Sequence, residues 1–357
     1  MKRIALRLLL LFVLLYLFFV SISLMSASFK LFGKDFAQQL LATTANPFVG
    51  LLIGILATSL VQSSSTTTSM TVALVASGAI DINGAIPIIM GANVGTSVTN
   101  TLVSIAQISR AEEFKRAFAA ATVHDCFNLL AVAILFPLHL LTNFLGIASN
   151  YMAVSFQNLG GVNFFNPLKA ITSPAVKMIQ ALTLDSGVIM LVLALIFLFV
   201  SLRYIVVNLK ALIIGKVEAF FNETLFKNPV RALILGVILT VMVQSSSITT
   251  SLAVPLAGAG ILTLRQIFPF TLGANIGTTI TAMLAALVTS NVTSIAAAFA
   301  HFLFNVFGIA VIWPFRNLPL RFAEKLAEFA IRSRAVPIIY IILIFFLIPT
   351  FFIFIFG

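Results

Sequence analysis

Long apolar segments separated by short polar ones run along the whole chain. A helix needs about 20 apolar residues to cross the hydrocarbon core of a membrane. The pattern predicts uninterrupted spanning helices over five ranges: Ile4–Phe29, Phe114–Leu145, Ser186–Val207, Ser294–Phe315 and Val336–Phe356. Three other ranges are expected to differ: a loop region at Ala148–Asp185, an amphipathic link ending at Lys227, and a basic amphipathic stretch at Arg316–Arg334 that precedes the final helix.

The remaining apolar sequence is an internal duplication. Residues Asn46–Asn100 match Asn228–Ala282 at a constant offset of 182 residues, without a gap and with about two positions in five identical. Each copy begins with Asn-Pro, carries Gln-Ser-Ser-Ser in its middle and has a glycine-flanked Asn near its end. Both copies are therefore expected to form the same structural unit.

The apolar run before each Gln-Ser-Ser-Ser motif is too short to span a membrane. Pro47–Leu60 holds 14 residues, about 21 Å of helix against a core of about 30 Å. Asn46 and Asn228 suit a helix N-cap, and the proline that follows each suits the first helical position. A second short run after the serines ends near Gly78 or Gly260. Two short arms joined by a polar turn predict a re-entrant hairpin.

The segment after each hairpin is predicted to be a discontinuous spanning helix, because Pro87 or Pro269 and then Gly-Ala-Asn-x-Gly interrupt it. With both hairpins re-entrant, three full crossings separate them, and an odd number of crossings inverts the second copy. The predicted fold class is an all-α membrane protein of two inverted repeats. Its parts are residues 1–148 and 185–315 for the repeats, 149–184 for an external linker, and 316–357 for an interfacial helix and a last span.

Composition and charge support this assignment. Hydrophobic residues make up 61% of the chain and charged residues 9%, against about 25% charged in soluble domains. The net charge of +11 does not indicate a nucleic-acid partner, because the basic residues lie in short segments between apolar blocks. With a cytoplasmic N-terminus, only Lys30, Lys34, Lys169 and Lys177 of the 21 Lys and Arg residues fall outside. The positive-inside rule therefore favours a multi-pass protein of the plasma (inner) membrane. A secretory signal is the alternative for the N-terminus, and the duplication favours a retained helix.

Inverted repeats with helices broken near mid-membrane are typical of secondary transporters. The predicted central site contains neutral hydroxyl and amide groups, which donate to anion oxygens, and carbonyl or hydroxyl oxygens, which coordinate Na⁺. Moving an anion into an inside-negative cell costs about 2.3 kcal/mol per charge per 100 mV, a cost that sodium coupling would offset. No cofactor other than co-transported Na⁺ is expected. The polar residues concerned are Gln62, Ser63, Ser64, Ser65, Thr66, Thr67, Asn93, Thr96, Thr99, Gln244, Ser245, Ser246, Ser247, Asn275, Thr278 and Thr281.

Five segments of the chain resemble the type II sodium-dependent phosphate cotransporter family: VQSSSTTTS, IPIIMGANVGTSVTNTLVS, FKRAFAAATVHDCFNLLAV, VQSSSITTS and TLGANIGTTITAMLAAL. The resemblance implies inward Na⁺-driven uptake of inorganic phosphate, with phosphate at Ser63, Ser64, Ser65, Asn93, Ser245, Ser246, Ser247 and Asn275. It places sodium at Gln244, Ser245, Thr278 and Thr281, with Gln62, Ser63, Thr96 and Thr99 as a weaker counterpart set. Animal members have a large loop between the repeats. The corresponding segment here, residues 148–185, is short and contains no cysteine, so the chain resembles a minimal bacterial member.

Several alternatives remain at this stage. The transported anion could be another small oxyanion, or the chain could be an assembly factor that kept the fold. An intramembrane hydrolase is disfavoured, because the serines are duplicated without an activating acid and base for each copy. Serine and threonine can also serve helix packing alone. Asp125 is a candidate for ion handling or for a structural hydrogen bond to the neighbouring hairpin. The oligomeric state stays open, with a homodimer as one option.

Overall fold

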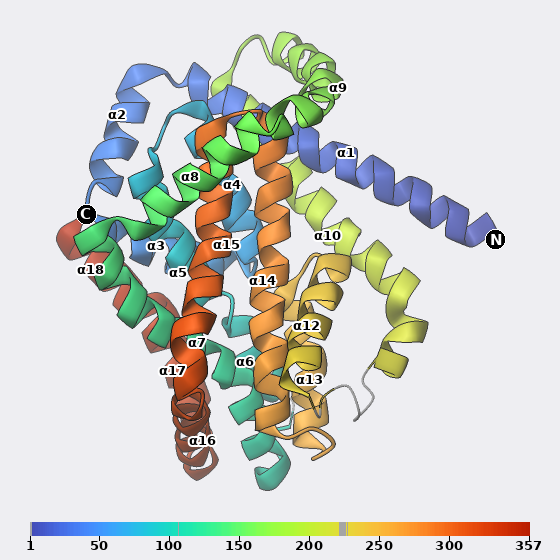
Figure 1. The fold of residues 1–357 in the computed structure, drawn as a ribbon, viewed down its shortest axis with the longest axis vertical. Coiled ribbons are helices and arrows are strands. Elements are labelled where there is room, and N and C mark those ends of the chain that lie inside the picture. Colours follow the sequence, from blue (N-terminus) through green and yellow to red (C-terminus); the bar gives the residue numbers. More distant parts are fainter. Residues whose placement is uncertain (1, 106, 221–225, 227) are drawn as a thin grey trace.

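The computed structural model describes residues 2–105, 107–220, 226 and 228–357, and within them the chain is helical, without strands (Figure 1). The helices are α1 (Lys2–Leu31), α2 (Gly33–Thr44), α3 (Pro47–Val61), α4 (Ser64–Ser77), α5 (Ile82–Gly95), α6 (Val98–Ile105), α7 (Ala111–Thr142), α8 (Phe144–Asn158), α9 (Gly161–Leu182), α10 (Gly187–Phe220), α12 (Pro229–Val243), α13 (Ser246–Gly258), α14 (Leu264–Thr289), α15 (Val292–Ile312), α16 (Asn317–Arg332), α17 (Ala335–Ile342) and α18 (Ile348–Phe356).

Seven helical segments of the described chain are long and apolar enough to cross a membrane. They are Leu6–Leu31, Ile82–Ile105, Ala111–Thr142, Gly187–Asn208, Leu264–Thr289, Val292–Phe315 and Ala335–Phe356. The pair α2 and α3 would add an eighth if counted as one span, although the two helices bend by 99° at their junction. The chain is therefore an all-helical, multi-pass membrane protein.

The short arms around each serine motif begin and end as the residues predict. Asn46 caps α3 by accepting from the backbone N–H of Phe48, and Asn228 caps α12 by accepting from Val230 and Arg231. Both helices carry proline at the first position and end at a glutamine in the left-handed region. In Figure 1, α3 and α4 lie above α12 and α13 along the long axis of the molecule.

The two segments predicted to be broken differ from each other. The first ends as α5 at Gly95 and resumes as α6 at Val98, whereas the second is the single 26-residue helix α14. The prediction of a break in the second copy is therefore wrong. Pro87 and Pro269 lie inside α5 and α14 without ending either helix. The break in the first copy contains Ser97, whose Oγ lies 2.9 Å from His124 Nδ1, while the equivalent Thr279 bonds within its own helix to the carbonyl of Ile276.

The region predicted to be a loop, Ala148–Asp185, is mostly helical, formed by the end of α8 and by α9. Two residues of α9, Thr172 and Val176, are buried, as is its C-cap, Thr183. Ile171 and Lys177 are exposed. This spacing of four and seven residues is that of a helix with one covered face. The predicted amphipathic link is helical as far as Phe220, and apart from Phe226 its remainder lies outside the described residues.

The two repeat copies make the same close helix crossing. Gly54 on α3 faces the carbonyl of Ile88, and Gly91 on α5 faces the carbonyl of Leu51. In the second copy, Gly236 faces the carbonyl of Phe270 and Gly273 faces that of Leu233. A side chain at any of these positions would overlap the facing backbone, so glycine is needed for the approach, as in small-residue contacts of membrane helices. These glycines join helices rather than interrupt them.

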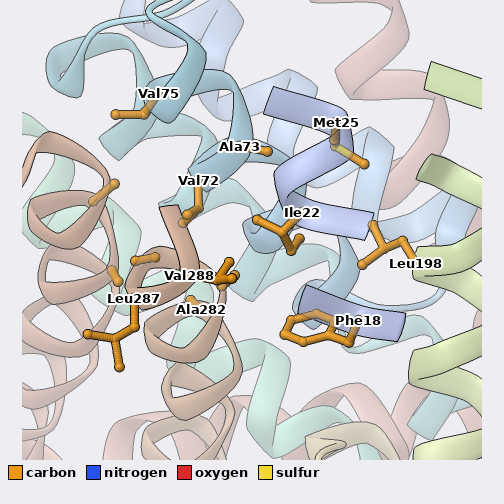
Figure 2. Packing of buried hydrophobic residues seen from close by; sticks show 14 of the residues in the cluster. Phe18, Ile22, Met25, Val72, Ala73, Val75, Leu198, Ala282, Leu287 and Val288 are labelled. Carbon is orange, nitrogen blue, oxygen red and sulfur yellow. The ribbon is translucent and has the colours of Figure 1, made fainter. Parts of the chain in front are cut away.

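A large apolar core lies where elements of both halves meet. Figure 2 shows Phe18 and Ile22 of α1 beside Val72 of α4 and Val288 of α14. Since α4 belongs to the first copy and α14 to the second, this core holds the copies together. The post-serine helix of the second copy also packs on the first copy: α13 contacts α6 and α7. The amphipathic helix α16 packs along α7.

Candidate functional site

The two serine motifs adopt the same backbone turn. Gln62 and Gln244 have φ values of 58° and 56°, in the left-handed region. The next residue in each copy, Ser63 or Ser245, is the N-cap of the following helix and accepts a hydrogen bond from the backbone N–H of Thr66 or Ile248. Each turn therefore ends one helix and starts another within three residues, which leaves the first backbone N–H groups of α4 and α13 without intrahelical partners.

The next two serines in each motif keep their hydroxyl groups free. Ser64, Ser65, Ser246 and Ser247 are between 4% and 7% exposed. Within the described part of the chain their Oγ atoms make no hydrogen bond. Each of these atoms nevertheless keeps a small exposed area. Four such hydroxyls at two helix N-termini are therefore groups available for a ligand.

Each glutamine of the turns holds a threonine of the following segment. Thr99 Oγ1 donates to Gln62 Oε1 at 2.8 Å, and Thr281 Oγ1 donates to Gln244 Oε1 at 2.9 Å. The structure thus brings together part of each predicted sodium set. Thr96 and Thr278 instead donate to the carbonyls of Ala92 and Ala274 in their own helices, which leaves a lone pair on each hydroxyl.

The two glycine-flanked asparagines connect the copies crosswise. Asn275 of the second copy bonds to His124 and, at 2.9 Å, to Asn128 of the first. Asn93 of the first copy receives a 3.3 Å bond from Asn305 of the second, and its Oδ1 lies 3.4 Å from His301 Nε2. All these residues are at most 4% exposed.

The predicted anion residues Asn93 and Asn275 therefore lie in a network that joins the two halves. The network also includes residues that were not among the predicted site residues: His124, Asn128, His301 and Asn305. The signal for them was present, because His-x-x-x-Asn occurs at 124–128 and again at 301–305.

The two serine motifs themselves share no hydrogen bond within the described residues. A direct contact between the second hairpin and the first copy comes from Thr250 of α13, whose Oγ1 donates to Asn100 Oδ1 of α6 at 3.0 Å. On the other hairpin, Asn291 Nδ2 lies 3.5 Å from the carbonyl of Ala76 in α4. Each hairpin is thus tied to the opposite copy.

Asp125 is fully buried and accepts a hydrogen bond from Tyr340, whose hydroxyl lies 3.1 Å from Asp125 Oδ2. Tyr340 belongs to α17, in the last spanning segment. The structural hydrogen bond of Asp125 was expected to involve the neighbouring hairpin. That expectation is wrong, because the bond observed comes from the C-terminal helix α17.

Comparison with known proteins identifies the family. A family model described as Na⁺/Pi-cotransporter matches residues 17–159 and 196–318. The chain belongs to this family. The sodium-dependent phosphate transport protein 2B of Homo sapiens is 34% identical over 443 aligned positions, which cover 96% of this chain and 64% of the human protein. The 2A proteins of Rattus norvegicus and Ovis aries are 34% and 35% identical, each covering 94% of this chain and 65% of their own lengths.

The chain spans slightly less than two thirds of the relatives that it matches. No solved structure matches the chain. The alignments of this Na⁺/Pi-cotransporter family member with its relatives are longer than the 357 residues of the chain, so the relatives carry additional residues inside the aligned region. The family model leaves out residues 160–195, where α9 lies.

Proposed function

We propose that this chain is a secondary active transporter that carries inorganic phosphate into the cell together with Na⁺, by alternating access around a site formed by both serine motifs. The observation that supports this most is the set of four unbonded hydroxyls on Ser64, Ser65, Ser246 and Ser247. Each pair occupies the first turn of a helix, where N–H groups and the helix dipole favour an anion. The named functions of the relatives, sodium-dependent phosphate transport, agree with it.

The site would be assembled from two inverted repeats, each with a re-entrant hairpin. Three observations support the inversion: the crosswise asparagine contacts, the packing of each hairpin on the opposite copy, and the charge distribution along the chain. Residues 1–148 and 185–315 would form the repeats, with 149–184 on the outside and 316–357 adding the interfacial helix and the last span. The N-terminus would then be cytoplasmic. The relatives are named as transport proteins, and the chain would likewise act as a transporter and not as an enzyme.

Sodium would bind beside each glutamine turn. The Gln244, Ser245, Thr278 and Thr281 set offers one amide oxygen and three hydroxyl oxygens, ligands suited to a hard cation. The Gln62, Ser63, Thr96 and Thr99 set offers the same atoms in the first copy. No Lys or Arg is among the residues of either set, so bound Na⁺ would supply the positive charge that holds phosphate in the site. Neither cation nor anion needs a cofactor.

Uptake into proteoliposomes tests the proposed function. Purified protein in lipid vesicles should accumulate radiolabelled phosphate when an inward Na⁺ gradient is imposed, and not when K⁺ replaces Na⁺. Flux that is independent of Na⁺ would contradict sodium coupling. Flux with sulfate but not with phosphate would favour the other candidate, a sodium-coupled transporter of a different oxyanion.

The two glutamines permit a matched test of the sodium sites. Gln244→Leu removes the oxygen that accepts from Thr281, and Gln62→Leu removes the equivalent acceptor for Thr99. Loss of one ion–dipole contact of about 1.5–3 kcal/mol corresponds to about a 10- to 150-fold rise in the Na⁺ concentration for half-maximal uptake. We expect this rise for Gln244→Leu and a smaller one for Gln62→Leu. Equal Na⁺ dependence in both variants and wild type would argue against sodium at either turn.

A further inference from the structure

A polar cavity of about 400 Å³ lies away from the serine motifs, between α1, α9 and the ends of α4 and α14. Its lining includes three lysines, Lys30 of α1 and Lys169 and Lys177 of α9, and no carboxylate among the residues that the structure describes. Hydroxyl and amide side chains supply the other polar lining, among them Ser23, Thr172, Gln180 and Ser290. In the proposed topology this cavity faces the outside of the cell.

The charges on the three lysines are not neutralised locally. None of them takes part in an ion pair within the described residues. Asp185 is the acid found beside the cavity, where it accepts a 2.7 Å bond from Gln180 without lining the cavity itself. Three positive charges against one negative charge leave a net attraction for anions, which the low-dielectric walls of a cleft strengthen.

The cavity is also a defined structural feature and not only a group of surface lysines. Ser23 and Thr172 meet at 3.3 Å and hold α9 against α1. Ser290, another lining residue, sits in the left-handed region with φ of 51° at the end of α14. A ligand that accepts hydrogen bonds would be held by the lysine ammonium groups that line the cavity.

We propose that this cavity is an outer binding site for a small oxyanion, with inorganic phosphate as its ligand, separate from the transport site. It would raise the phosphate concentration at the entrance to the translocation path. Lys169 and Lys177 lie in the segment that the family model does not match. The role of the cavity in uptake rests on the proposed function, whereas binding of phosphate does not.

Binding is tested on the full chain in detergent by chemical protection. The protein is treated with a water-soluble amine-acylating reagent, with phosphate or with gluconate of equal ionic strength, and labelling is measured by mass spectrometry. We expect phosphate to slow the labelling of Lys169 and Lys177 by about threefold relative to Lys34, a lysine that does not line the cavity. Equal rates with and without phosphate would overturn the site. Protection by added anionic phospholipid and not by phosphate would assign the cavity to a lipid headgroup instead and also overturn it.

The effect on uptake is tested with the variant K30Q/K169Q/K177Q in proteoliposomes. We expect the apparent KM for phosphate to rise about threefold to tenfold at low ionic strength, near the lower end of known electrostatic steering effects. The maximal rate should not change, and the difference should shrink at high ionic strength, because salt screens exposed charges. K30R/K169R/K177R should behave as wild type, and Lys34→Gln is the matched control.

The two proposals fail in different ways. If wild-type protein shows no Na⁺-driven phosphate uptake, the proposed function fails, and the protection experiment still decides whether the cavity binds phosphate. If wild type transports phosphate and K30Q/K169Q/K177Q has the same KM at all ionic strengths, the outer site is wrong and the proposed function stands.

Discussion

Replacing Ser64 and Ser65 together by alanine, or Ser246 and Ser247 together, is expected to reduce phosphate uptake by about 100-fold or more at sub-saturating phosphate. Each pair removes two hydroxyl donors, and a hydrogen bond to a charged group contributes about 1.5–3 kcal/mol. Two lost bonds therefore correspond to about 3–6 kcal/mol, or at least a 100-fold change. The neighbouring Ser63 and Ser245 are left in place because they cap α4 and α13, and an alanine there would also weaken the helix.

Two serines on the same helices provide the controls. Ser77 of α4 donates to the carbonyl of Leu74, and Ser251 of α13 donates to the carbonyl of Ile248. Ser77→Ala and Ser251→Ala each remove one hydroxyl away from the turns and should retain uptake. Size-exclusion profiles of all variants in detergent report whether they fold. A strong loss in one double variant with normal uptake in the other would contradict a site shared by both motifs.

The sequence predicted the local structure of the turns because that structure depends on neighbouring residues. Asn46 and Asn228 cap their helices, and the serine of each turn caps the next one, as short-range capping chemistry requires. The duplication then predicted that both turns would be alike. The seven apolar segments were likewise visible from composition and length alone.

The sequence did not predict features that depend on tertiary contacts. The helix of the first copy breaks after Gly95, where Ser97 meets His124 of another helix, whereas the equivalent Thr279 bonds within the continuous helix α14. Helix α9 contains Pro167 and Pro174 and no long apolar run, so its helical face became apparent only from the burial of Thr172 and Val176 against the body of the protein.

The glycines of Gly-Ala-Asn-x-Gly were interpreted as interruptions of a helix, and the structure gives Gly91 and Gly273 a different role, since each faces a backbone carbonyl of a neighbouring helix. Their signal was a spacing of four residues within one helix, Gly91 to Gly95 and Gly273 to Gly277, which is typical of closely packed membrane helices. A single helix cannot show which other helix it will contact. The distinction between a flexible glycine and a contact glycine therefore needed the tertiary structure.

Gly91→Ala and Gly273→Ala are expected to destabilise the protein severely. A methyl group at Gly91 overlaps the carbonyl oxygen of Leu51, and one at Gly273 overlaps that of Leu233. Overpacking a side chain in a core costs about 1–3 kcal/mol, and backbone cannot move aside as a side chain does, so α3 and α5, or α12 and α14, must separate. We expect a cost at the upper end of this range, seen as a lower melting temperature in detergent or as loss of the monodisperse protein peak.

Gly308→Ala is the matched control for these two variants. Gly308 lies in α15, also within a spanning segment, and an added Cβ meets a side-chain atom, Ala131 Cβ, at 3.3 Å rather than a backbone carbonyl. A shift of a few tenths of an ångström relieves that contact, so Gly308→Ala should melt close to wild type. Because the equivalent crossings in the two copies are alike, Gly91→Ala and Gly273→Ala should lower the melting temperature by similar amounts. A wild-type melting temperature for either variant would contradict the close helix contact concerned, which is α3 with α5 for Gly91 and α12 with α14 for Gly273.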